Sequence, residues 1–170
     1  MEPIRELIAV DLEMTGLQVK TDRILEIGAV RLVDGQLRDT FQTFVNPHRR
    51  IDARITELTG IRPEMVENAP EAEEALQKFL EFAGEAPFLG HNVIFDYSFL
   101  KQCAVNHKIS LERSALDTLK IARKVLKEPE KKSLEALCGY FQIDREHAHR
   151  AVDDAKATAE LFLMLQQKYQ

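Results

Sequence analysis

Four carboxylates and one imidazole stand at three separated places in this chain. Asp11 and Glu13 lie two residues apart near the N-terminus, Asp96 lies in the middle, and His149 and Asp154 lie near the C-terminus. Carboxylates bind hard divalent cations, and an imidazole titrates near neutral pH, where it can accept a proton from water. Together these residue types predict metal-assisted hydrolysis of a phosphodiester by water.

The Asp11 and Glu13 pair is expected at the end of a strand. Residues two apart on a strand point to the same face, so both carboxylates would project together. Such a pair can hold two cations roughly 4 Å apart. An Asp-x-Glu sequence also occurs at strand ends that simply face solvent. The pair therefore indicates a metal site only in combination with Asp96, His149 and Asp154.

Asp96 is predicted to point inward from a helix. If Asn92 is the N-cap, Asp96 takes the fourth helical position, beyond the reach of capping, and shares a face with Phe99, Leu100 and Cys103. A buried carboxylate needs a compensating cation, and a metal ion would serve. The alternative is a structural ion pair with Arg or Lys.

The last group requires a choice between two neighbouring acids. Asp154 shares a helical stripe with Thr158, Leu161 and Leu165, whereas Asp153 lies on the more polar side, where it would complement the helix dipole. We therefore expect Asp154 to be the functional acid. His149, on the loop before this helix, is the predicted proton acceptor, and the alternative for it is an ordinary surface histidine.

Hydrophobic patterning predicts the elements that must position these residues. Strands are expected over residues 7–12, 24–33, 36–45, 87–90 and 114–116, the second and third joined by a hairpin turn at Asp34-Gly35. Helices are expected over 71–83, 92–106, 118–126, 133–141 and 151–168, with Asp117 as an N-cap. Strands first, then strands alternating with helices, predict an α/β fold with a mixed sheet.

Composition restricts the function further. A chain of 170 residues with 45 % hydrophobic content fits one domain, residues 1–170. Its apolar runs are too short for a membrane span and its N-terminus does not resemble a signal peptide, so a cytoplasmic protein without membrane contact is expected. No P-loop, nucleophile elbow or zinc-type spacing is present, which argues against nucleotide triphosphatases and nucleophilic hydrolases.

The net charge of −5 is unusual for a nucleic-acid partner. A site with four convergent carboxylates is itself acidic until cations fill it, so the charge does not exclude such a partner. Local basic runs at 48–50, 131–132 and 145–150 are read either as solvated surface or as a phosphate groove.

The ordered motifs resemble the DEDDh group of 3′-to-5′ exonucleases, the DnaQ-like family that includes the bacterial DNA polymerase III epsilon subunit. The segment Val10-Asp11-Leu12-Glu13-Met14-Thr15-Gly16 is similar to the first family motif. Gly90-His91-Asn92-Val93-Ile94-Phe95-Asp96 resembles the second, and His149-Arg150-Ala151-Val152-Asp153-Asp154-Ala155 resembles the third. Leu58-Thr59-Gly60-Ile61 is a further similar segment, so the resemblance covers nearly the whole chain.

This resemblance implies an RNase H-like fold, a five-stranded mixed sheet with an antiparallel second strand, flanked by helices. It also implies two divalent cations, Mg²⁺ or Mn²⁺. Asp11 would bridge both cations, Glu13 and Asp154 would complete one site, and Asp96 would hold the second. His149 would be the general base, and Leu12, Met14 and Thr15 would contact the terminal nucleotide, with core or turn roles as the alternative for these three.

The implied substrate is the 3′ end of a nucleic acid, released as nucleoside 5′-monophosphates. DNA single strands or unpaired 3′ ends, in proofreading or repair, are favoured. The first motif also resembles that of oligoribonuclease, which leaves an RNA-trimming enzyme open, and a non-catalytic nucleic-acid- or polymerase-binding module is a third alternative. A polymerase partner, a larger parent polypeptide and a homodimer are further expectations.

Overall fold

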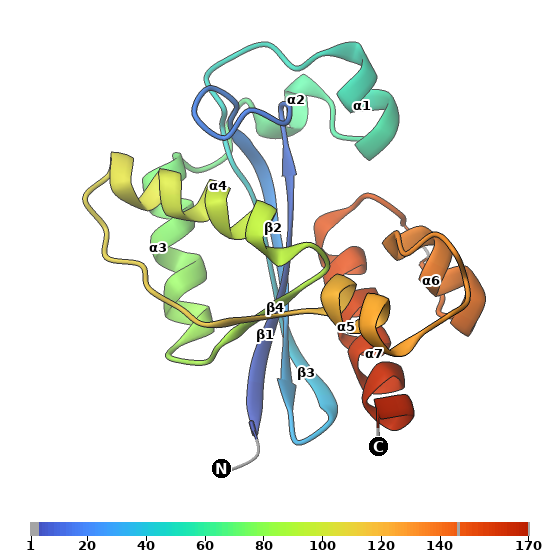
Figure 1. Ribbon diagram of the computed structural model, residues 1–170. Helices are drawn as coiled ribbons and strands as arrows, with labels where there is room; N and C mark the ends of the chain where they lie inside the picture. The colour runs from blue at the N-terminus through green and yellow to red at the C-terminus, as the bar shows by residue number, and fades with distance from the viewer. Residues whose placement is uncertain (1–3, 146, 170) are drawn as a thin grey trace.

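Five strands form one mixed sheet in the order β3-β2-β1-β4-β5 (Figure 1). In this computed structural model, which describes residues 4–145 and 147–169, the strands are β1 (Glu6–Met14), β2 (Ile24–Val33), β3 (Gln36–Phe44), β4 (Phe88–Gly90) and β5 (Ala115–Asp117). β2 pairs antiparallel with both β1 and β3, while β1, β4 and β5 run parallel. The predicted five-stranded mixed sheet with an antiparallel second strand is therefore confirmed.

The helices follow the order expected from the sequence. They are α1 (Ala53–Thr59), α2 (Pro63–Val66), α3 (Ala72–Ala83), α4 (Val93–Asn106), α5 (Thr118–Val125), α6 (Leu134–Phe141) and α7 (Ala151–Tyr169). The five helices and five strands given residue ranges above are all present, with ends within two residues of the prediction. Within the described part of the chain, none of the helices has the length and apolar character that crossing a bilayer requires.

Helices cover both faces of the sheet (Figure 1). On one face, Ile8 and Val10 of β1 join a core cluster with Phe79 of α3 and Leu100 of α4. On the other, alternate residues of β1 pack against α7 in a second cluster that contains Leu7, Ala9, Ala155 and Ala159. Because side chains alternate along a strand, the row that begins with Leu7 and Ala9 continues with Asp11 and Glu13 on the α7 face.

Two turns show how local sequence sets the chain direction. Asp34 and Gly35 have φ values of 49° and 81°, as a two-residue hairpin turn requires, so the predicted hairpin is confirmed. Asn92 precedes α4 as expected, but the predicted side-chain cap is wrong. Its φ is 62° and its side chain makes no cap hydrogen bond; its backbone N–H instead donates to Oδ1 of Asp117 at 2.8 Å. Asp117 caps α5 as predicted.

Candidate active site

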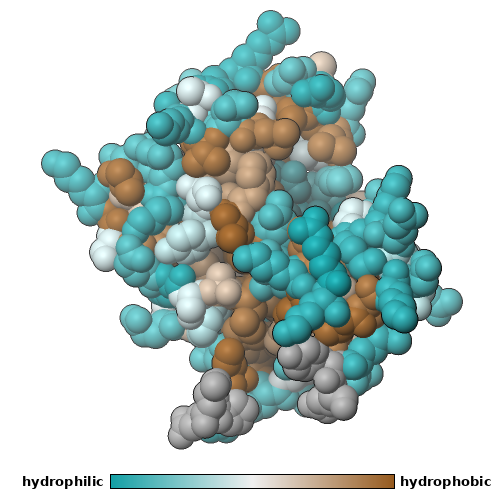
Figure 2. All heavy atoms as spheres, viewed as in Figure 1, coloured by the Kyte–Doolittle hydropathy of each residue, from teal (hydrophilic) through white to brown (hydrophobic). Residues whose placement is uncertain are grey.

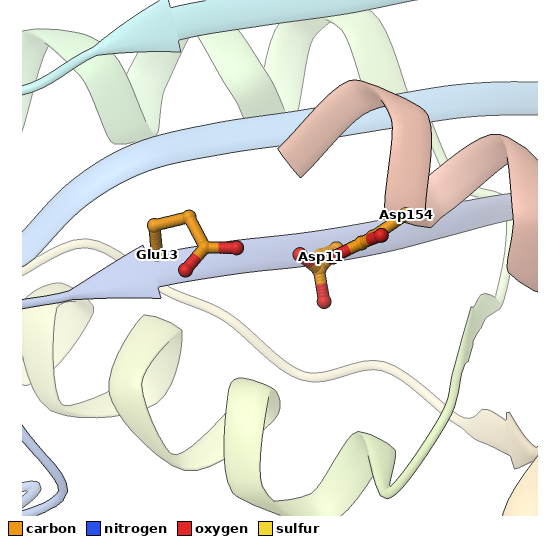
Figure 3. A group of neighbouring side chains, drawn as sticks. All are labelled: Asp11, Glu13 and Asp154. Carbon is orange, nitrogen blue, oxygen red and sulfur yellow. The ribbon is translucent and has the colours of Figure 1, made fainter. Parts of the chain in front are cut away.

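The last part of β1 carries the two N-terminal acids toward α7. Figure 3 shows Asp11 and Glu13 rising from β1, with Asp154 reaching Asp11 from the helix. One carboxylate oxygen from each of these three residues lies within 4.8 Å of the others. Residues separated by more than 140 positions in the chain thus form one acidic cluster, because α7 packs across β1 and β2 at this point.

Asp154 is the inward acid of α7. Its exposed fraction is 4 %, whereas Asp153 is only half-buried. Oδ1 of Asp154 accepts hydrogen bonds from Arg145 Nη2 at 2.8 Å and Nε at 3.1 Å, and Oδ2 accepts the backbone N–H of His149 at 3.1 Å. The predicted stripe of α7 is also present, since Thr158, Leu161 and Leu165 are buried with Asp154.

Asp96 lies beside this cluster rather than inside it. It takes the fourth position of α4, as expected, and is 6 % exposed. It is not one of the three residues whose oxygens converge within 4.8 Å. Its charge nevertheless acts on Asp11, raising the pKa of that carboxyl after the larger effect of burial. The structure therefore brings Asp96 within electrostatic range of the other acids.

Burial and mutual repulsion shift the titration of the cluster. Burial, followed by the negative charges of Asp154, Glu26 and Asp96, raises the pKa of Glu13 to about 9. Burial also raises the pKa of Asp11 well above its ordinary value, with Asp96 and Glu13 as the next causes. The pKa of Asp96 is raised by burial and then by Asp117. These shifts have two causes: burial removes water from the charged form of each carboxylate, and neighbouring negative charges repel it.

A divalent cation fits this arrangement. Oδ2 of Asp11 is buried, and no described residue donates a hydrogen bond to it. An oxygen of this kind normally has a partner, because leaving it without one costs about 1–3 kcal/mol. Three converging carboxylates form the oxygen-rich donor set that Mg²⁺ and Mn²⁺ prefer. Arg145 donates to Oδ1 of Asp154, so this oxygen already has a partner within the protein.

His149 lies on the rim of the cluster. It is half-buried, and its backbone takes a positive φ of 65°. Burial raises the pKa of Asp154, while Arg145 and, to a smaller extent, His149 lower it. Among the residues that the structure describes, none forms a hydrogen bond with the imidazole. His149 is thus tied to the cluster through its backbone, while its ring nitrogens are not engaged by any described residue.

The three expected substrate contacts occupy different environments. Leu12 is 4 % exposed and belongs to the core on the α3–α4 face, which is the core alternative considered for it. Met14 is half-buried against the same core. Thr15 Oγ1 donates to Asp22 at 2.9 Å and accepts the backbone N–H of Arg23 at 2.9 Å, so its side chain also organises the turn after β1.

One residue of the site, Glu26, was not anticipated. Glu26 of β2 is 1 % exposed and pairs with Arg150, which directly follows His149. Arg145 and Arg150 belong to the basic run at 145–150, so this run is partly engaged with acids inside the protein. Glu26 could have been found from the sequence, because it is an acid within the otherwise apolar strand segment Ile24-Leu25-Glu26-Ile27.

Comparison with known proteins identifies the fold and the family. The family model described as Exonuclease (RNase_T) matches residues 8–162. The chain belongs to this exonuclease family. This exonuclease chain is 45 % identical over 165 residues, 97 % of its length, to a DNA polymerase III PolC-type protein of Caldanaerobacter subterraneus subsp. tengcongensis. It is 36 % identical over 161 residues, 93 % of its length, to the PolC-type protein of Bacillus subtilis.

The exonuclease spans only a small part of these relatives, 12 % and 11 % of their respective lengths. Among solved structures it resembles Exonuclease X in complex with 5′-overhanging duplex DNA, with a TM-score of 0.76 and 25 % identity, covering 95 % of this chain and 91 % of the other. The chain is therefore of the DnaQ-like 3′-to-5′ exonuclease type.

Proposed function

We propose that residues 1–170 form one exonuclease domain that shortens DNA from unpaired 3′ ends and proofreads for a replicative polymerase. The single observation that carries the catalytic part is the convergence of Asp11, Glu13 and Asp154 within 4.8 Å around a buried Asp11 oxygen without a hydrogen-bond partner. The polymerase context is supported by the names of the PolC-type relatives. This exonuclease would then act as part of, or together with, a larger replication protein.

We infer that Asp11, Glu13 and Asp154 hold one divalent cation, and that Asp11 and Asp96 hold a second. Mg²⁺ or Mn²⁺ suits these oxygen ligands. When bound, the cations lower the pKa of water and stabilise charge that develops on phosphate oxygens. Asp96 lies outside the tightest cluster, which supports its assignment to the second cation.

The residues of the chain would then act as follows. Asp11 lies between Glu13 and Asp154 in Figure 3, so it would share a cation with both. His149, tied to Asp154 through its backbone N–H, accepts a proton from the attacking water at an imidazole nitrogen. The water oxygen bonds to phosphorus as the bond from phosphorus to the 3′ oxygen of the preceding nucleotide breaks. That oxygen stays on the shortened strand and takes a proton from solvent to become a 3′ hydroxyl, and the terminal nucleotide leaves as a nucleoside 5′-monophosphate.

The terminal nucleotide would lie against the end of β1, where Met14 and Thr15 are partly accessible. Leu12 would support this surface from the core. Figure 2 shows hydrophobic side chains gathered along the middle of one face, between hydrophilic flanks, and an unpaired base could stack on such a surface. Leu17, Leu58 and Ile94 are among the large hydrophobic side chains that are more than half exposed, so they are candidates for such contacts.

The cellular setting follows from the polymerase context. A replication exonuclease of this type would work in the cytoplasm. Formation of a homodimer stays a prediction, which light scattering of the purified chain tests. RNA trimming, in the manner of oligoribonuclease, is the alternative outcome of the substrate assay.

The direct test incubates the purified chain and Mn²⁺ with 5′-labelled oligonucleotides. Single-stranded DNA, RNA, and duplex DNA with a paired or mismatched 3′ end are compared, with Asp11→Asn as the inactive control. We expect stepwise shortening from the 3′ end, faster on single strands and mismatched ends. Intact substrates throughout would reject the catalytic proposal, and faster cleavage of RNA than of DNA would replace proofreading by RNA trimming.

A further inference from the structure

Glu26 occupies a place directly beside the acidic cluster. In the β1–β2 register, Glu13 stands opposite Glu26 and Asp11 stands opposite Gly28. Directly paired residues of antiparallel strands point to the same face, so Glu26 and Gly28 also face α7. The two β2 positions next to the candidate metal ligands are thus the ones that meet the start of α7.

Both carboxylate oxygens of Glu26 are fully engaged at this junction. Oε1 accepts hydrogen bonds from Arg150 Nε at 3.2 Å and from the backbone N–H of Ala151 at 3.0 Å. Oε2 accepts from Arg150 Nη2 at 2.9 Å and from Gln42 Nε2 at 2.8 Å. Three of the four bonds therefore come from two consecutive residues at the beginning of α7.

The bond to Ala151 has a particular consequence. Ala151 is the first residue of α7, and the first N–H groups of a helix have no acceptor within the helix. Glu26 supplies that acceptor from another strand and so fixes where the helix begins. His149 stands two residues before Ala151 and Asp154 three residues after it, so one anchor sets the place of both.

Glu26 also carries an electrostatic cost. Its negative charge is among the causes that raise the pKa values of Asp11 and Glu13. A buried ion pair can often be replaced by apolar residues without loss of stability, so stability alone does not account for a carboxylate here. What the carboxylate provides is a directed set of hydrogen bonds, and supporting bonds of this kind commonly determine metal affinity and activity.

We propose that Glu26 is the positioning residue of this site, which anchors the start of α7 to β2 and thereby aligns Asp154 and His149 with Asp11 and Glu13. This inference rests on the proposed function. It assigns Glu26 no contact with metal or substrate. Arg150 and Gly28 act with it, the first as a bidentate partner and the second by allowing the helix to approach the strand.

The decisive variant is Glu26→Asp, which keeps the charge but shortens the side chain by one methylene. If Glu26 acted only through its charge, Mn²⁺ binding would stay unchanged. If it positions α7, we expect the Mn²⁺ affinity measured by calorimetry to fall about tenfold or more, and kcat to fall about 10- to 100-fold with an unchanged KM. The matched control is Glu6→Asp, which alters the ion pair with Arg31 at the other end of the same two strands.

For a second variant, the electrostatic role and the positioning role predict opposite changes in Mn²⁺ affinity. Arg150→Gln removes a positive charge near the acids, so a purely electrostatic role predicts tighter Mn²⁺ binding. The positioning role predicts weaker binding, and this comparison holds even where Glu26→Asp does not fold. Melting curves confirm that each variant is folded at the assay temperature.

The outcomes separate the two proposals. A loss of Mn²⁺ affinity below about threefold for Glu26→Asp, an equal loss for Glu6→Asp, or tighter binding by Arg150→Gln overturns the positioning role. A wild-type chain that binds Mn²⁺ yet leaves every oligonucleotide intact rejects the proposed function, whereas the binding comparison still tests Glu26.

Discussion

Oδ2 of Asp154 accepts the backbone N–H of His149 at 3.1 Å. This bond links a candidate metal ligand on α7 to the loop that carries the candidate general base. The two motif residues are therefore mechanically connected, and a change at Asp154 affects both. Its neighbour Asp153 has no such bond among the described residues.

Asp154→Asn is expected to lower the Mn²⁺ affinity and to reduce exonuclease turnover by at least about a hundredfold, because it removes a ligand charge and weakens the acceptor for His149. Asp153→Asn is the matched control and should stay within about threefold of wild type. Calorimetry and an oligonucleotide assay measure both quantities. An equal loss in the two variants would show that the wrong neighbour was assigned.

His149→Ala should reduce kcat by about 10²- to 10⁴-fold, since general-base catalysis contributes an effect of this size. Metal affinity should be retained, because the bond to Asp154 comes from the backbone and survives the substitution. His147→Ala, an exposed histidine of the same loop, is the control. Full activity of His149→Ala would remove this residue from the mechanism.

The acidic cluster should make the metal-free protein less stable as the pH rises. The folded-state pKa of Glu13 is raised from 4.5 to about 9, so the folded state binds more protons than the unfolded state between these values. The stability due to Glu13 is therefore fully present below about pH 4.5 and is lost as the pH rises through about 9.

Urea unfolding in EDTA at several pH values measures this effect against Glu13→Gln, which cannot ionise. In EDTA the variant should gain stability relative to wild type as the pH increases. In a parallel series with Mg²⁺ in place of EDTA, the cation should stabilise the wild type more than the variant. A stability difference that is independent of pH would contradict the raised pKa of Glu13.

Gly28→Ala should destabilise the fold by about 1–3 kcal/mol, as overpacking in cores does, and weaken Mn²⁺ binding. A Cβ at this position would lie 2.2 Å from the backbone nitrogen of Val152 and 2.3 Å from the carbonyl carbon of Ala151, so α7 would have to move away from β2. Gly139→Ala is the control. It lies within α6, and apart from its chain neighbours and the backbone of its own helix no described atom lies within 4 Å of its Cβ position, so the variant should gain about 0.5–1 kcal/mol. Equal stability of both variants would contradict the close approach.

Local sequence was sufficient for most of the fold. The apolar run of β1, the Asp34-Gly35 turn and the uninterrupted helix formers of α7 each predict their element from neighbouring residues alone. Asn92 shows the limit of such reasoning. Its side chain was expected to cap α4, but a carboxylate 25 positions later, Asp117, takes its backbone N–H and permits the positive φ.

The sequence by itself determined the residue types of the site, the face of β1 that carries Asp11 and Glu13, and the preference for Asp154 over Asp153, because strand and helix periodicity act over a few residues. Only the tertiary structure decided that Asp154 lies within 4.8 Å of the β1 acids, that Asp96 stands beside this cluster, and that Glu26 holds the start of α7. These relationships depend on how a helix packs across two strands, and packing between segments more than a hundred residues apart follows no local periodicity.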